Sequence, residues 1–158
     1  MVHFKLKKEL ESGEIAKVRL TDSYSIKPFD CGVPDLNNFL FNDAKTHLKY
    51  LSAVTYLFEN KDKTIAYYSL QNDLLNIDPH NDKDFDQEIS KIIADKDYSF
   101  LLEMKDISMF PAAKIGRFAV NAEFQRSEYG TQILHLIIWN IYKWLNKSNI
   151  RPPDLAQF

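Results

Sequence analysis

The chain has 158 residues, of which 45% are hydrophobic and 13% aromatic, enough apolar side chains for one globular domain with its own core. A net charge of −2 argues against a general nucleic-acid-binding protein or one that binds anionic membranes. The single cysteine, Cys31, excludes an internal disulfide framework and a multi-cysteine metal cluster. The N-terminal segment is charged and does not resemble a signal peptide, so the default prediction is a cytoplasmic protein.

Charge is uneven along the sequence. Residues 82–106 contain eight acidic side chains and four lysines, so this block has a charge of −4. With −2 for the whole chain, the remainder is about +2. A small local basic site is therefore allowed.

The first half of the sequence predicts three strands and one helix. Residues 16–21 alternate as a strand does, and residues 22–32 form a loop. Residues 53–58 and 64–70 predict two strands joined by a polar turn of hairpin length. Residues 33–51 have a helical period, with these apolar side chains on or beside one face: Leu36, Phe39, Leu40, Ala44, Leu48 and Leu51.

The second half begins with a long connection, residues 76–110, in which residues 86–96 predict a short amphipathic helix. Residues 110–120 then predict a strand, and residues 130–146 a helix. This helix is apolar nearly all round, which predicts burial on several sides. We expect Trp139 and Trp144 in the core, and His135 packed or hydrogen-bonded.

A short loop, Gln125 to Thr131, connects the predicted strand and helix. A helix N-terminus offers unpaired backbone N–H groups to an anion. Gly130 permits close approach, Arg126 adds a cation, and the Glu128 charge opposes a phosphate. Neither a Walker loop nor a Rossmann fingerprint is present, and the alternative is a polar turn that binds no ligand.

In context, the run KIGRFAVNAEFQRSEYGTQIL resembles the acetyl-coenzyme A motif of the GCN5-related N-acetyltransferases. In that family a strand leads through a loop of the form Gln/Arg-x-x-Gly-x-Gly/Ala into a helix. Gln125 and Gly130 match the ends of this pattern, and Glu128 stands at the position of its first glycine. Three earlier residues, Phe118, Ala119 and Val120, match the strand ending.

The N-terminal part carries a second resemblance. The run PFDCGVPDLNNFLFNDA is similar to the entry into the first helix in a subgroup of this family. Some members of that subgroup are toxins that acetylate aminoacylated transfer RNA. The IAYYSL strand and the long insertion also recur there, so the resemblance covers about residues 16–146.

The resemblance implies a fold, a co-substrate and a site. The fold would be a mixed α/β domain with a mostly antiparallel sheet and flanking helices, the acyl-CoA N-acyltransferase fold, spanning residues 1–158. The chain would transfer an acetyl group from acetyl-coenzyme A to an amine, either a small molecule or an aminoacyl-tRNA. The implied cofactor-binding residues are Phe118, Ala119, Val120, Gln125, Arg126, Ser127, Glu128, Tyr129, Gly130 and Thr131.

No catalytic residue can be named from the sequence. By resemblance, the backbone N–H of Val120 is the donor to the thioester oxygen. Gln71, Glu103 and Asp106 could face a cleft, but a solvated surface position is the more economical interpretation of each. Tyr67 and Tyr68 are expected to pack in the core or a substrate wall, and Cys31 to be a buried thiol. The histidines share no metal-ligand spacing, so no metal site is expected.

The family continues after the motif helix with further strands, so we expect the domain to be incomplete after about residue 146. The resulting exposed sheet edge and uncovered helix predict a homo-oligomer. We expect this truncation to weaken or abolish acetyl transfer. The alternative function is a non-catalytic family member that acts as an oligomeric protein-interaction module.

Overall fold

The computed structural model describes residues 5–76 and 109–147. The chain divides into two compact units, one of residues 1–72 with 113–158 and one of residues 73–112. Of the second unit, the described residues are the ends of two strands. The single-domain organisation stays a prediction, and the expected helix at 86–96 lies outside the described residues.

The described part contains a four-stranded antiparallel sheet in the order β1-β2-β3-β4. These strands are Ala16–Arg19, Val54–Glu59, Thr64–Asn76 and Met109–Val120. In the register, Val18 pairs with Leu57, and Leu57 with Tyr67. The predicted fold class, a mixed α/β domain with a mostly antiparallel sheet and flanking helices, is confirmed.

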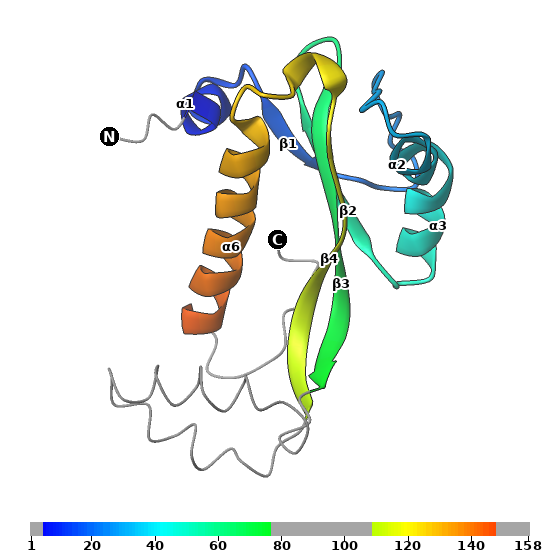
Figure 1. Cartoon of the computed structure of the whole chain (residues 1–158), viewed down its shortest axis with the longest axis vertical. Helices are drawn as coiled ribbons and strands as arrows, with labels where there is room; N and C mark the ends of the chain where they lie inside the picture. The colour runs from blue at the N-terminus through cyan, green and yellow to red at the C-terminus, as the bar shows by residue number, and fades with distance from the viewer. Residues whose placement is uncertain (1–4, 77–108, 148–158) are drawn as a thin grey trace. The chain divides into compact units, whose positions relative to one another are not determined.

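Helices lie on both faces of this sheet (Figure 1). On one face are α1 (Lys5–Ser12) and α6 (Tyr129–Lys147), and their buried side chains pack with Tyr56, Phe58 and Tyr68. On the other face, α2 (Pro34–Asn38) and α3 (Ala44–Lys49) pack with Leu57, Tyr67 and Ala119. Alternate side chains of β2 therefore contribute to two separate cores.

The predicted helix at 33–51 is three consecutive helical segments. They are α2 (Pro34–Asn38), the π-helical turn η1 (Phe39–Asp43) and α3 (Ala44–Lys49). Phe39, Leu40 and Ala44 are buried as the period predicted. Leu51 is 89% exposed with φ +55°, so its place on the buried face was wrong: the helix ends before it.

The burial predicted for the motif helix was partly wrong. Ile133 and Ile137 are buried, but Ile138 and Trp139 are 56% and 52% exposed, and His135 is exposed as well. Apolar side chains all round the helix suggested several packing partners. Within the described residues, however, α6 presents one stripe to the sheet and α1. The side chain of Trp144 lies outside the described part.

The N-terminal helix α1 was not predicted. Leu6 and Leu10 lie one turn apart and both contact the core. Two surface ion pairs, Lys5–Glu9 and Lys7–Glu11, follow the same four-residue spacing. That spacing was the sequence signal for a helix. Among the described helices, none is long and apolar enough to cross a membrane.

Candidate functional site

The loop between β4 and α6 has a backbone shape that glycine normally provides. Arg126 has φ +58° and Glu128 φ +67°, values in the left-handed region that cost an L-residue roughly 1–2 kcal/mol each. Glu128 therefore keeps the glycine conformation at the position where the family motif has its first glycine. Gly130 is different, because a Cβ there would meet Val120 Cγ2 at 3.6 Å, an ordinary contact. Alanine would fit at Gly130.

Directly after this bend lie backbone N–H groups that have no partner among the described residues. The Glu128 carbonyl accepts the Gln132 N–H at 3.0 Å, the first intrahelical bond of α6. The N–H groups of Tyr129, Gly130 and Thr131 precede it and point out of the helix end. Together with the positive end of the helix dipole, they form a surface suited to an anion.

The end of β4 offers a further backbone donor. Asn121 N–H donates to Ile65 O of β3 at 2.8 Å. Because adjacent residues of a strand point their N–H and C=O groups to opposite sides, those of Val120 point away from β3. The Val120 carbonyl there accepts from Gln125 Nε2 at 2.9 Å. Its N–H is thus directed to the edge that β3 does not cover.

Gln125 also connects this loop to the segment before α2. Its Nε2 donates to Cys31 O at 3.0 Å, and Ala122 N–H donates to Asp30 O at 2.8 Å. Ser127 Oγ donates to the Phe124 carbonyl, closing the loop on itself. The two sequence motifs that carried the resemblance are therefore joined by hydrogen bonds in the structure.

The FDCG segment is held by a small polar network. Asp30 Oδ1 accepts from the Gly32 N–H at 2.8 Å and from Asn37 Nδ2 at 2.7 Å, which lower the Asp30 pKa. Asn37 Oδ1 in turn accepts from the Cys31 N–H at 3.0 Å and its thiol at 3.2 Å. Cys31 is buried and participates in this network, in agreement with the expected structural role.

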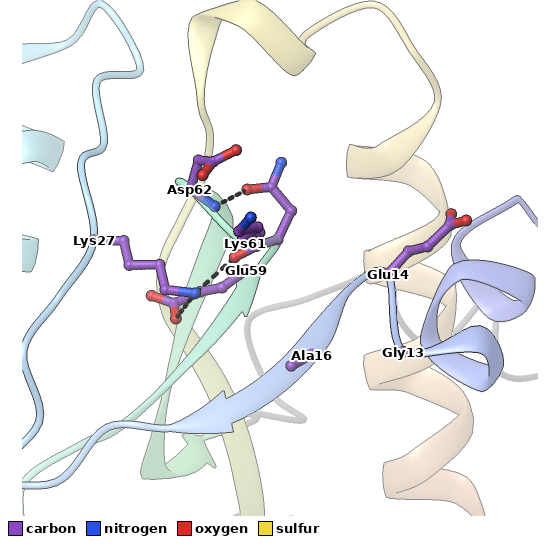
Figure 2. A pocket seen from close by; sticks show the side chains of 8 residues that line it. Gly13, Glu14, Ala16, Lys27, Glu59, Lys61 and Asp62 are labelled. Atoms are coloured by element: carbon purple, nitrogen blue, oxygen red, sulfur yellow. Dashed lines mark hydrogen bonds and ion pairs between the residues drawn. The ribbon is translucent and has the colours of Figure 1, made fainter.

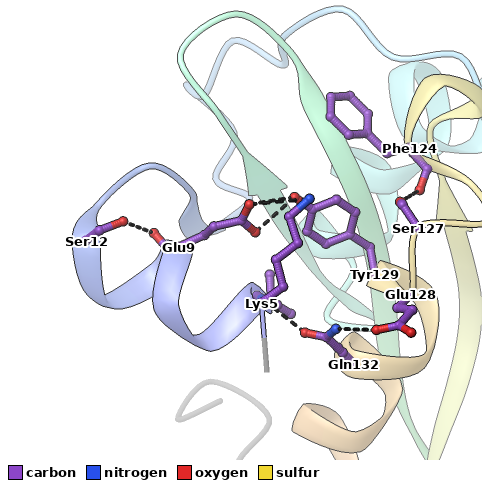
Figure 3. Close-up of polar contacts among 9 residues, drawn as sticks. Lys5, Glu9, Ser12, Phe124, Ser127, Glu128, Tyr129 and Gln132 are labelled. Atoms are coloured by element: carbon purple, nitrogen blue, oxygen red, sulfur yellow. Dashed lines mark hydrogen bonds and ion pairs between the residues drawn. The ribbon is translucent and has the colours of Figure 1, made fainter. Parts of the chain in front are cut away.

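Tyr129 anchors the start of α6 to α1 (Figure 3). It is buried, its hydroxyl donates to the Glu9 carboxylate at 2.9 Å, and Lys5 Nζ lies 4.9 Å from its ring centroid. Burial, followed by the bond to Glu9, raises the Tyr129 pKa. Its side chain therefore belongs to the core, and only its backbone N–H is available to a ligand.

The other side chains considered within the described residues lie on β3 and β4. Tyr67 is fully buried and its hydroxyl donates to Leu36 O at 2.8 Å, while burial raises its pKa. Gln71 is half-buried beside Gly116 of β4. Arg117 Cζ lies 5.4 Å from the Phe39 ring centroid, which places on the motif strand a cation that the sequence did not single out. Glu103 and Asp106 lie outside the described residues.

The strand β4 does not alternate strictly. Ile115 and Phe118 are three residues apart, yet both pack against the hydrophobic core between α6 and the sheet. Ala119 packs on the opposite face of the sheet. Strict alternation would place Ile115 and Phe118 on different faces. The strand therefore slips by one residue between them, as at a β-bulge, which bends a strand locally.

A separate hollow of about 470 Å³ lies near the turn between β2 and β3 (Figure 2). Its wall includes Glu59, which is 2% exposed. This carboxylate accepts from Tyr24 at 2.5 Å and Thr64 at 2.8 Å, and Lys27 lies 3.7 Å away. The hydrogen bond to Glu59 raises the Tyr24 pKa to about 12. These contacts satisfy the buried charge without a ligand.

Comparison with solved structures supports the fold. The chain is similar to a mutant of KacT, with a TM-score of 0.62 and 18% identity over 87% of this chain and 74% of that one. AtaT complexed with acetyl-methionyl-tRNAfMet has a TM-score of 0.60 and 16% identity over 82% and 69%. AtaTR bound with AcCoA has 0.58 and 17% over 87% and 71%. No protein-family model and no curated protein sequence matches the chain.

These similarities define the class of fold. The four-stranded antiparallel sheet and its flanking helices match the acyl-CoA N-acyltransferase fold. At these identities the similarity establishes the architecture alone.

Proposed function

We propose that this chain binds acetyl-coenzyme A and transfers its acetyl group to an amine. The observation that carries the proposal is the loop at residues 125–131. It keeps the left-handed bend of a glycine-rich pyrophosphate loop at Glu128, although Glu128 is not glycine. The bend exposes three helix-end N–H groups to which a diphosphate can bind.

The edge of β4 is suited to bind the pantetheine arm of acetyl-coenzyme A. The pantetheine arm contains two amide groups, and the edge of β4 that is uncovered among the described residues provides backbone donors and acceptors for them. The Val120 N–H points to that edge, and the Val120 carbonyl accepts a hydrogen bond from Gln125 Nε2. We assign to this N–H the donor role at the thioester oxygen.

The proposed step is direct transfer. The neutral amine nitrogen attacks the thioester carbon, the carbon–sulfur bond breaks, the nitrogen loses a proton, and the thiolate takes one. Fixed donors at the thioester oxygen stabilise the charge that develops there. We assign no side chain to either proton transfer.

The acceptor class is part of the proposal. One similar structure holds AtaT with acetyl-methionyl-tRNAfMet, so an aminoacyl-tRNA amine is the first candidate and a small-molecule amine the second. The net charge of −2 gives little general attraction to RNA. An RNA acceptor would therefore need a local basic surface.

Two measurements test the function. Calorimetry with acetyl-coenzyme A should give binding, and release of free thiol should depend on an added amine or aminoacyl-tRNA. Val120→Pro, which removes the N–H at the exposed edge, should abolish thiol release. Absence of heat and of a thermal shift at millimolar ligand would refute the proposal.

A second candidate is a non-catalytic interaction module. Leu134, Ile138 and Trp139 are exposed on α6, and β4 is an edge strand in the described sheet. Both features suit contact with another chain. A stable oligomer that neither binds coenzyme A nor releases thiol would favour this candidate.

A further inference from the structure

The carboxylate of Glu128 is held to the side of α6. Gln132 Nε2 donates to Glu128 Oε2 at 3.4 Å (Figure 3). A residue four positions further along a helix lies one turn away on the same side. The contact therefore holds the carboxylate on the side of the first turn where Gln132 lies, the side that faces α1.

The orientation of the Gln132 amide is itself fixed. Its Oε1 accepts the Leu6 N–H at 2.8 Å, and the side chain is buried. Leu6 is in the first turn of α1, whose N–H groups have no partner inside the helix. A reversed amide would place NH₂ against this N–H, so the NH₂ group is turned toward Glu128.

A negative charge at the mouth of an anion site opposes binding, and the penalty falls with distance. Holding the carboxylate back reduces that penalty without removing the charge. We propose that Gln132 is a positioning residue of the coenzyme site, which restrains Glu128 so that a diphosphate can reach the loop. This inference rests on the proposed function, and it assigns the restraint to α1 through the Leu6 N–H.

Two substitutions at Gln132 test the inference, each made in the unmodified chain and in a Glu128→Gln background. Gln132→Glu keeps the acceptor for Leu6 but repels Glu128, and Gln132→Met removes the donor. Coenzyme A binding should weaken about fivefold in the first variant and about twofold in the second. In a Glu128→Gln background no carboxylate needs restraint. Gln132→Met, which also removes the acceptor for Leu6, should then leave binding unchanged, and Gln132→Glu should keep only the smaller effect of its own added charge.

The same weakening in both backgrounds would overturn the inference, since Gln132 would then act only by holding α1 to α6. Thermal unfolding of each variant measures that structural contribution separately. Glu128→Gln alone should bind coenzyme A more tightly than the unmodified chain. Weaker binding in that variant would also contradict the proposed restraint.

A second probe separates this inference from the proposed function. Inorganic pyrophosphate should shift the amide resonances of residues 129–131, with the same dependence on Gln132 and Glu128. If that dependence appears but no thiol is released with any amine, the inference holds and the function is wrong. If thiol is released but pyrophosphate binding does not depend on Gln132 and Glu128, the proposed function holds and the inference is wrong. Binding of neither probe would refute both.

Discussion

Arg126 and Glu128 show how two residues hold a glycine-like bend without glycine. Each has a left-handed backbone, which is strained for a residue with a Cβ. The hydrogen bonds from Gln125 Nε2 to the Cys31 and Val120 carbonyls offset this backbone strain. The bend is therefore imposed by its surroundings.

Replacing either residue by glycine should separate backbone strain from charge. Glu128→Gly and Arg126→Gly should each stabilise the fold by about 1 kcal/mol, because glycine adopts positive φ freely. Their effects on coenzyme A should be opposite: the first should tighten binding and the second weaken it. Urea unfolding and calorimetry measure the two effects, and an equal change in affinity for both variants would contradict a role for the charges.

Tyr24 predicts a pH dependence of stability. Its hydroxyl bonds to Glu59 only when protonated, and its pKa is raised to about 12 from an unfolded value of about 10. Stability from this bond is complete below about pH 10 and is lost as pH rises through 12. The stability difference between the unmodified chain and Tyr24→Phe should therefore shrink between those values in urea titrations. A constant difference would refute this assignment.

At the scale of elements, the Gln71 side chain of β3 lies against Gly116 of β4. An added Cβ at Gly116 would lie 2.8 Å from Gln71 Cδ, closer than packing allows. The slip in alternation of β4 occurs at this same place. The glycine thus accommodates the half-buried glutamine of the neighbouring strand.

Gly116→Ala should destabilise the fold by about 1 kcal/mol, because the Gln71 side chain must move. In a Gln71→Ala background the same change should stabilise by about 0.5 kcal/mol, since alanine is the better strand residue. The difference is a coupling energy measured by four urea titrations. A cost that persists without the glutamine side chain would place the clash in the backbone instead.

For the whole molecule, the exposed apolar stripe of α6 and the edge of β4 are the surfaces that a second copy could cover. We predict a homo-oligomer, and light scattering should give a mass above that of one 18.5 kDa chain. Ile138→Glu should shift the mass to that of a monomer, because burying a carboxylate at a contact is unfavourable. Tyr50→Glu, at an exposed position in the turn after α3, is the matched control.

The sequence by itself determined the strands, the helix before β2 and the strand–loop–helix unit, because their hydrophobic periods are local. It also identified the loop through Gln125, Gly130 and the preceding FAV. The burial of Trp139 and Leu51 was predicted wrongly, since a period shows an apolar face but not whether another element covers it.

Only the tertiary structure decided which backbone conformation the loop residues adopt and which residues they contact. The left-handed backbone of Glu128, the bond from Gln125 to Cys31 and the chain of contacts from Leu6 through Gln132 to Glu128 join residues up to 126 positions apart. No local pattern specifies such pairs, because they form only when the sheet brings α1, the FDCG segment and α6 together. For the same reason Glu128, which the sequence suggested was a defect, occupies the glycine conformation of an intact bend.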